Sequence, residues 1–470
     1  MSNTKTVMSQ AANTLTALPN VEDVFSTYLF SANNSTQQIT NGIDLDGEGG
    51  LVWLKSRTNT YSHGLYDTER GVNLVIYSDL SNAEGTTTNL LNSFNSDGFT
   101  LGQNENSNFS SGDSVSWTFR KAPRFFTCLT YSGTGPGSGA NEQQVSHDLG
   151  AKPGIVMIKR TDATGDWWVF TDVIDGSNDY GYLNQTAAFG SSANNVATDS
   201  VFSVGGVLNT SGATYVAYLF ASNDGDSGFT GGDIIKCGSY TGNSSTQEID
   251  LGFEPQWILI KKAVTESGGY PADWFIFDSM RGMVVDGNDA LLYPNEANAE
   301  ASQAILSPQP TGFRLDTVAG SFNATGATYI YIAIRRGTKV PESATEVFSP
   351  NLASGYPRYP SGFATDFVIQ KSRSSGSGSA YSRLQGNNNL DPSTTAQESA
   401  SAWDWAQMTG SGTNFTSTNY IGWNWKRAPG YFDVVAYTGD GVAGRTVSHN
   451  LGVAPEMMWV KRRNTSRVWS

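Results

Sequence analysis

Two acidic turns of one pattern carry the residues best suited to chemistry. Both place an Arg three residues and a Gly four residues after an Asp: Asp67, Arg70 and Gly71 in one, Asp278, Arg281 and Gly282 in the other. A glycosidase needs two carboxylates flanking one sugar bond, and Asp67 with Glu69 is one of only two tight acidic groups. A catalytic Asp is not expected to recur inside a repeated turn. The pattern therefore favours a structural Asp that accepts from turn amides or pairs with the Arg.

The second acidic group is Asp44, Asp46 and Glu48, in a glycine-rich loop. Carboxylates at this density suit Ca²⁺, although their spacing matches no known calcium loop, and both interpretations stay open. The three histidines, His63, His147 and His449, are too far apart for a zinc site or a Ser-His-Asp arrangement. We predict no catalytic residue, no cofactor and no metal, and expect that the chain is not an enzyme.

Tryptophans provide the remaining candidates for ligand contact. At loop tips they would act as stacking platforms for sugars, and in a core they would be packing residues. The candidates for carbohydrate stacking are Trp167, Trp168, Trp274, Trp403 and Trp405.

The elements that must position these residues are marked by a short recurring run. Four apolar residues rich in β-branched and aromatic types are followed by Lys, which suits a buried strand whose Lys marks its emergence into water. The run occurs at residues 51–57, 155–160, 257–262, 367–373 and 457–463, about 90 to 110 residues apart. Its lysines are Lys55, Lys159, Lys261, Lys371 and Lys461.

The spacing predicts an all-β chain of tandem, jelly-roll-like β-sandwich repeats of about 100 residues, behind a short N-terminal helical or irregular anchor. Short polar junctions, such as the Ala-Pro pairs at residues 122–123 and 428–429, favour a semi-rigid string of units. The predicted boundaries are 1–20 for the anchor, 21–125 for repeat 1, 126–232 for repeat 2, 233–343 for repeat 3, 344–430 for repeat 4 and 431–470 for an incomplete repeat 5.

Both ends of the chain carry expectations of their own. Apolar residues before Pro19 recur at helical spacing: Val7, Met8, Ala11, Leu15 and Leu18. They predict an attachment peptide or a short oligomerising helix, with a frayed terminus as the alternative. Repeat 5 stops in the middle of the pattern, so we expect the natural protein to continue beyond Ser470, because half a sandwich cannot bury its core.

Composition limits the function classes. The 43 acidic and 29 basic residues give a net charge of −14, which argues against binding nucleic acid through its phosphates. No apolar run is long enough to insert into a membrane, and no secretory signal opens the chain. Cys128 and Cys237 occupy equivalent positions in two repeats, which disfavours a disulfide between them. Extracellular-looking repeats without an export signal suit a virion protein released by lysis.

The repeat resembles a known family. Residues 250–255 read Asp-Leu-Gly-Phe-Glu-Pro, followed by the strand at 257–261, and with the turn at 67–71 they are similar to tandem repeats in virion structural and tail-fibre-like proteins of marine bacteriophages, of the cyanophage type. The resemblance covers residues 21–470. It implies a virion appendage and supplies no catalytic residues.

We therefore expect a bacteriophage tail fibre or related virion appendage, located on the tail or another external part of the particle. Its N-terminal part would dock on tail or adaptor proteins, and its repeats would project toward a host glycan or protein contacted by the distal part. A homotrimer is the favoured oligomer. The alternatives are a purely structural virion protein, such as a tail hub, collar or capsid decoration, and a polysaccharide depolymerase.

Overall fold

The computed structural model describes residues 19–470 except 105–106, 109–110, 136–141, 193–195, 226–227, 230 and 377. The all-β prediction is confirmed: the described chain is built of antiparallel sheets with two four-residue α-helices. The predicted attachment residues Val7, Met8, Ala11, Leu15 and Leu18 lie outside the described residues.

Repeats 1 to 3 share one topology, a six-stranded sheet faced by a smaller one. Repeat 1 contains α1 Val21–Val24, β1 Phe25–Ser31, β2 Gln37–Thr40, β3 Gly50–Ser56, β4 Gly64–Asp67, β5 Leu74–Tyr77, β6 Gly85–Thr86, β7 Leu91–Asn95, β8 Gly98–Leu101 and β9 Asp113–Arg120. Its sheets have the orders β1-β9-β3-β4-β5-β6 and β2-β8-β7.

Repeats 2 and 3 follow the same plan. Repeat 2 contains β10 Phe126–Ser132, β11 Gln143–Ser146, β12 Pro153–Arg160, β13 Trp168–Thr171, β14 Asp179–Tyr182, β15 Gly190–Ser191, β16 Val201–Val204, the 3₁₀ turn Gly206–Asn209 and β17 Thr214–Ala221. Repeat 3 contains β18 Ile235–Thr241, β19 Gln247–Asp250, β20 Pro255–Val264, β21 Trp274–Asp278, β22 Asp289–Leu292, β23 Ala301–Gln303, β24 Leu306–Gln309, β25 Gly312–Leu315, α2 Gly320–Asn323 and β26 Thr328–Arg335.

Repeat 4 keeps a four-stranded sheet in the order β27-β32-β28-β29. Its elements are the 3₁₀ turns Ala344–Glu346 and Arg383–Gln385 and the strands β27 Phe348–Gly355, β28 Phe367–Ser372, β29 Gly378–Ser382, β30 Asn388–Asn389, β31 Ser399–Ala400 and β32 Phe415–Trp425. The expected strand at residues 457–463 is wrong, since residues 433–470 contain none. In repeats 1 to 4 a closing strand (β9, β17, β26 or β32) lies between the first strand and the recurring one, and no described residue takes that place in repeat 5.

The recurring strand is apolar throughout because both of its faces are covered. Successive side chains of a strand point to opposite faces of the sheet. Val52 and Leu54 pack with Phe99 of β8 inside the sandwich of repeat 1. Leu51 and Trp53 belong instead to a large core shared by repeats 1, 2 and 3.

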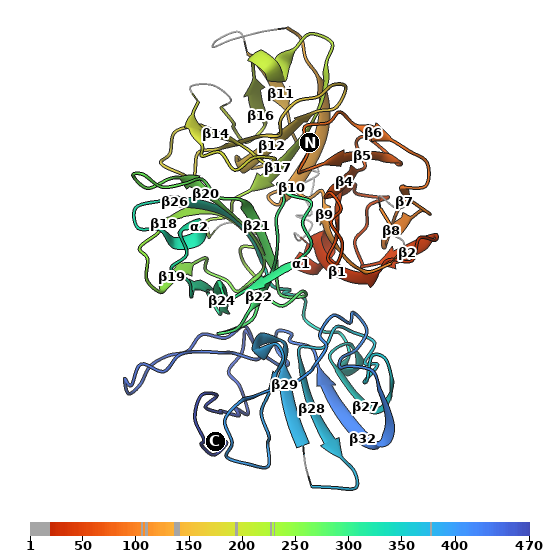
Figure 1. Cartoon of the computed structure of the whole chain (residues 1–470), viewed down its shortest axis with the longest axis vertical. Helices are drawn as coiled ribbons and strands as arrows, with labels where there is room; N and C mark the ends of the chain where they lie inside the picture. The colour runs from red at the N-terminus through yellow and green to blue at the C-terminus, as the bar shows by residue number, and fades with distance from the viewer. Residues whose placement is uncertain are drawn as a thin grey trace, which may run out of the picture.

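That shared core replaces the expected string of units with a ring. Repeats 1, 2 and 3 lie around a common centre, and repeat 4 lies below them (Figure 1). At the centre, Phe119 of repeat 1 contacts Phe126 and Phe220 of repeat 2 and Trp257 of repeat 3, with ring centroids 5.5, 5.6 and 5.7 Å apart. The string prediction is wrong because apolar residues on the outer face of each sheet are buried only against neighbouring repeats.

Candidate functional site

The lysines that end the recurring strands hold the ring together. The prediction that they emerge into water is wrong for repeats 1 to 3, where each lysine is fully buried. Each ammonium group donates to a carbonyl of one equivalent loop in the neighbouring repeat: Lys159 to Ser81 (3.1 Å), Lys261 to Thr186 (2.7 Å) and Lys55 to Ala297 (3.0 Å). Repeat 2 thus binds repeat 1, repeat 3 binds repeat 2 and repeat 1 binds repeat 3, which closes the ring.

An aromatic donor accompanies Lys159 and Lys261. Trp167 Nε1 donates to the carbonyl of Tyr77 at 2.8 Å, and Trp274 Nε1 donates to that of Tyr182 at 2.9 Å, in each case across a repeat boundary. In repeat 1 this position is His63, which is fully buried. The predicted sugar-stacking role is contradicted for Trp167 and Trp274, because neither ring is exposed.

His63 is held neutral at the boundary between repeats 1 and 3. Its Nδ1 accepts from Trp53 Nε1 at 3.1 Å, which places the ring proton on Nε2. Burial, together with the charges of Lys55 and Arg281, lowers the pKa of His63 well below its usual range. This histidine is therefore a packing residue.

The acidic turn of repeat 1 faces repeat 2. Asp67 accepts from the backbone and Nε of Arg70 at 2.9 and 2.6 Å, which confirms the predicted structural role. Tyr218 of repeat 2 donates to the same carboxylate at 2.7 Å. Burial alone would lower the pKa of Arg70, but Asp67 and other nearby groups offset this and the pKa is raised. Gly71 has φ +95°, a conformation that explains why the turn needs glycine.

The matching turn of repeat 3 faces repeat 1. Asp278 accepts from Arg281 Nε at 2.5 Å and from Trp117 Nε1 of repeat 1 at 3.0 Å, with both turn residues buried. The Arg281 guanidinium lies 5.2 Å from the Trp117 ring centroid and contacts Glu300 at 3.1 Å. Arg57 of repeat 1 binds Glu300 with two hydrogen bonds of 2.9 and 2.7 Å. Four charges are thus shared across one boundary.

The boundary between repeats 2 and 3 lacks both the Asp of the turn and the aromatic donor that binds it. By strand register, Ile332 in repeat 3 occupies the place of Trp117 and Tyr218. Thr171 in repeat 2 occupies the place of Asp67 and Asp278. A donor therefore occurs only where the neighbouring repeat supplies the carboxylate. A different order of repeats would leave Asp67 or Asp278 without its aromatic donor from the neighbouring repeat, so these residues favour the observed order around the ring.

The other tryptophan candidates lie on repeats 2 and 4. Trp403 and Trp405 are buried, 3% and 8% exposed, and Trp403 stacks on Tyr381 at 3.9 Å between centroids. Their predicted stacking on sugars is contradicted by this burial. Trp168 is half-buried beside Tyr180 and Tyr182, at 5.3 and 4.9 Å between ring centroids, and its stacking role stays a prediction.

The loop proposed for Ca²⁺ forms a turn of its own, in which Asp44 accepts from the backbone of Gly47 at 2.7 Å. Within the described residues, His, Cys, Asp and Glu side chains form no group of three suited to a metal. Both cysteines are buried and unpaired, in agreement with the expectation for Cys128 and Cys237. The described part of the chain holds no helix long and apolar enough to span a bilayer.

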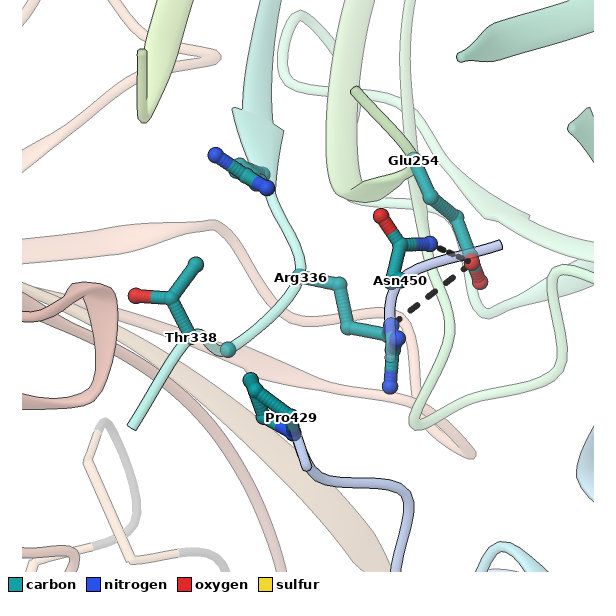
Figure 2. A pocket seen from close by; sticks show the side chains of 7 residues that line it. Glu254, Arg336, Thr338, Pro429 and Asn450 are labelled. Carbon is teal, nitrogen blue, oxygen red and sulfur yellow. Dashed lines mark hydrogen bonds and ion pairs between the residues drawn. The ribbon is translucent and has the colours of Figure 1, made fainter. Parts of the chain in front are cut away.

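A buried ionic cluster fastens the ring to the later repeats. Arg427, after β32, binds Glu254 of repeat 3 through two hydrogen bonds of 2.6 Å and binds Asp433 at 2.7 Å. Arg336 binds Asp433 at 3.2 Å. Asn450 donates to Glu254 at 3.1 Å, and Arg336 Nε lies 3.6 Å from the same carboxylate (Figure 2). The adjoining cavity of about 20 Å³ has room for a single water molecule. The cluster is therefore a structural joint.

Sequence reasoning found the turns but missed the partners that they hold. Trp117 and Tyr218 lie on the closing strands, whose alternation predicts only one aromatic face. The sequence did contain one informative feature: an aromatic residue that can donate a hydrogen bond, on the closing strand of one repeat, occurs together with an Asp in the turn of another repeat.

Comparison with known proteins identifies a family for this chain. The family described as "Domain of unknown function (DUF7483)" matches residues 20–336 and 359–470 of the chain. No curated protein is significantly similar to it. The match spans the ring and most of both later repeats.

Proposed function

The chain belongs to the DUF7483 family, whose description gives no function, and from the ring geometry we propose that it is a structural protein of a bacteriophage virion, a tail fibre or related appendage. The observation that carries the proposal is the closed ring of repeats 1 to 3. Charged and aromatic groups of neighbouring repeats are buried together, so the ring is one rigid body suited to bearing load and holding its outer loops in a fixed arrangement.

Adsorption to a host would then use many weak contacts. A rigid body that carries several similar loops, present in many copies on one particle, binds through effective concentration rather than through one deep pocket. The residues that could have suited a depolymerase are held by other contacts: Asp67 is fully buried and paired with Arg70, and the exposed Glu69 forms an ion pair with Lys121 at 2.9 Å.

A collar, hub or decoration protein is the second candidate, and the ring shape itself favours it. The ring provides a threefold arrangement within one chain, which could match a threefold site on the particle. A homotrimer of the chain stays a prediction, and native mass spectrometry of the purified protein tests it.

Cryo-electron microscopy of intact particles that carry the protein tests the proposal. If the protein is an appendage, repeat 1 should lie against tail or adaptor proteins and repeat 4 should lie farther from the particle. Rings lying flat on the capsid or enclosed within the tail would establish the collar, hub or decoration function instead. Absence of the protein from purified particles would contradict both.

A further inference from the structure

The contact between repeats 4 and 5 copies the contact between repeats 1 and 2. Lys461 Nζ donates to the carbonyl of Thr395 at 3.0 Å, as Lys159 does to Ser81 at 3.1 Å. Thr395 and Ser81 occupy equivalent places in their loops. The copy exists although residues 433–470 form no strand. Repeat 5 therefore docks on repeat 4 as one ring member docks on the next.

Three more hydrogen bonds repeat across the same two boundaries. First, Arg467 N donates to Thr395 O at 2.9 Å, as Gly165 N donates to Ser81 O at 2.8 Å. Second, Glu398 N donates to Arg463 O at 2.8 Å, as Glu84 N donates to Thr161 O at 2.9 Å. Third, Trp469 Nε1 donates to Asp391 O at 3.2 Å, as Trp167 Nε1 donates to Tyr77 O at 2.8 Å. In addition, Arg463 and Glu398 form the two-bond ion pair that Arg57 and Glu300 form between repeats 1 and 3.

The junction that leads into repeat 5 is also a copy. Ala428 and Phe432 form the same isolated bridge as Ala122 and Phe126 between repeats 1 and 2. The backbone of Gly430 donates to Leu451, as that of Arg124 does to Leu149. Repeats 4 and 5 thus correspond to the first and second members of the ring, and the pattern restarts after three repeats.

The faces that would continue such a ring are open. In repeat 4, Lys371 is exposed and Trp423 is half-buried, whereas their counterparts Lys55 and Trp117 are fully buried by repeat 3. In repeat 5, the run corresponding to a buried central strand lies at the surface. The exposed fractions are 74% for Met457, 69% for Met458, 56% for Trp459 and 42% for Val460.

We propose that repeats 4 and 5 are two members of a second three-repeat ring, whose open faces bind β-sandwich repeats of this same family. The occupant completes the sheet on residues 457–461 with a closing strand. It then presents a loop carbonyl to Lys371 and an Asp to Trp423, as repeat 3 does to Lys55 and Trp117. A second copy of residues 1–470 does not fit, because its equivalent loops in repeats 1 to 4 are already occupied. Their carbonyls accept hydrogen bonds from lysines of the same chain: Ser81, Thr186, Ala297 and Thr395.

A chimera tests the open faces directly. Residues 169–336, which are the rest of repeat 2 and repeat 3 through its closing strand β26, are appended to the full chain after Ser470, where the repeat pattern is in register. The readout is acetylation of individual lysines measured by mass spectrometry. We expect Lys371 to react about tenfold more slowly in the chimera than in the parent chain, because a shift of about 1.4 kcal/mol toward a closed interface changes its exposure tenfold.

The matched control appends residues 169–222 alone, which complete repeat 5 without supplying a third member. Lys371 should keep its parent reactivity there, while chymotrypsin cleavage at Trp459 slows. Equal Lys371 reactivity in both chimeras, with the appended residues resistant to protease, would overturn the proposal.

A second experiment uses the chain without additions. Glu398→Arg and Arg463→Glu each break the ion pair between repeats 4 and 5, and we expect chymotrypsin to cleave at Trp459 about tenfold faster in either variant. The double variant should be cleaved more slowly than either single variant, because the pair is re-formed with its charges exchanged. Its rate should stay above that of the parent, because Gln385 and Asn388 lose Glu398 as their acceptor. Arg462→Glu, at an exposed neighbour bound only to Asn464, is the control. Equal cleavage rates in all five proteins would show that repeat 5 is not docked, and the proposal would fail.

Discussion

The closed ring and the open pair of repeats 4 and 5 use one strand in two environments. Trp53 in the ring is 1% exposed, whereas Trp459 at the same place in repeat 5 is 56% exposed. Lys55 is fully buried and Lys371 is exposed. The residue types are alike, so the difference comes from what covers them: Lys371 lacks a neighbouring repeat, and Trp459 also lacks the paired strands of its own sheet. Burial of the recurring strand therefore needs both a complete sandwich and a neighbouring repeat.

Removal of the buried carboxylate of repeat 3 should break the ring most severely. Asp278→Ala leaves Arg281 and Trp117 without their shared acceptor, and we expect a loss of about 3 to 5 kcal/mol in the free energy of unfolding, with the nearby Glu300 keeping the value toward the lower end. Urea denaturation followed by tryptophan fluorescence measures it.

Thr171→Ala is the control at the boundary between repeats 2 and 3, which lacks the Asp-Arg turn. Thr171 donates to the carbonyl of Gly154 at 2.7 Å and accepts from the backbone of Val173 at 3.2 Å, both neutral partners inside repeat 2, so a loss of about 1 kcal/mol is expected. Similar losses in the two variants would mean that the buried charges do not hold the ring.

Loss of one hydroxyl between repeats 1 and 2 should have an intermediate effect. Tyr218→Phe removes the hydroxyl that donates to Asp67 and keeps the aromatic side chain in place. A hydrogen bond to a charged group contributes about 1.5 to 3 kcal/mol, so we expect a loss of that size in the free energy of unfolding. Tyr240→Phe removes a bond of 2.9 Å to the neutral carbonyl of Phe322 inside repeat 3 and should cost about 1 kcal/mol. A larger loss of unfolding free energy for Tyr240→Phe than for Tyr218→Phe would contradict the conclusion that charged contacts between repeats stabilise the ring.

The sequence predicted the all-β repeats and the role of the Asp-Arg turns because both depend on local patterns. Period-two alternation and recurrent Gly71 and Gly282 mark strands and a turn whatever the surroundings. The ring was not predicted, since a strand buried on both faces looks the same whether a second sheet or another repeat covers it. The lysines misled for the same reason: a Lys at the end of a strand usually reaches water, and here a neighbouring carbonyl takes its place.

Substitution of equivalent lysines compares the ring with the open pair directly. Lys159→Met keeps the apolar stem but leaves the carbonyls of Ser81 and Gly165 without the ammonium donor, so we expect a loss of about 1 to 2 kcal/mol. Lys371→Met changes an exposed side chain and should stay within about 0.5 kcal/mol of the parent. Thermal unfolding of both variants measures the difference, and equal effects would contradict the burial of Lys159 in solution.

The smallest expected effect is a dependence on pH that only a buried lysine produces. Burial lowers the pKa of Lys261 from its ordinary value of 10.5 to about 7. Below pH 7 both folded and unfolded states carry the proton, and folding bears the whole cost of burying the charge. As the pH rises from 7 toward 10.5, the folded state releases the proton while the unfolded state keeps it, so stability increases. Between pH 7 and 8 the gain should be about 1 kcal/mol, below the limit of roughly 1.4 kcal/mol per proton and pH unit.

The Lys261→Met variant isolates this contribution, because every other titrating group is common to both proteins. We expect the unfolding free energy of the parent minus that of the variant to increase from pH 7 to pH 8 in urea titrations at constant ionic strength. A falling difference for Lys261 would mean that the carbonyls of Thr186 and Ala272 stabilise the ammonium group more than burial destabilises it. Lys261 would then stabilise the ring most strongly when charged, and the stability that it contributes would decrease as the pH rises.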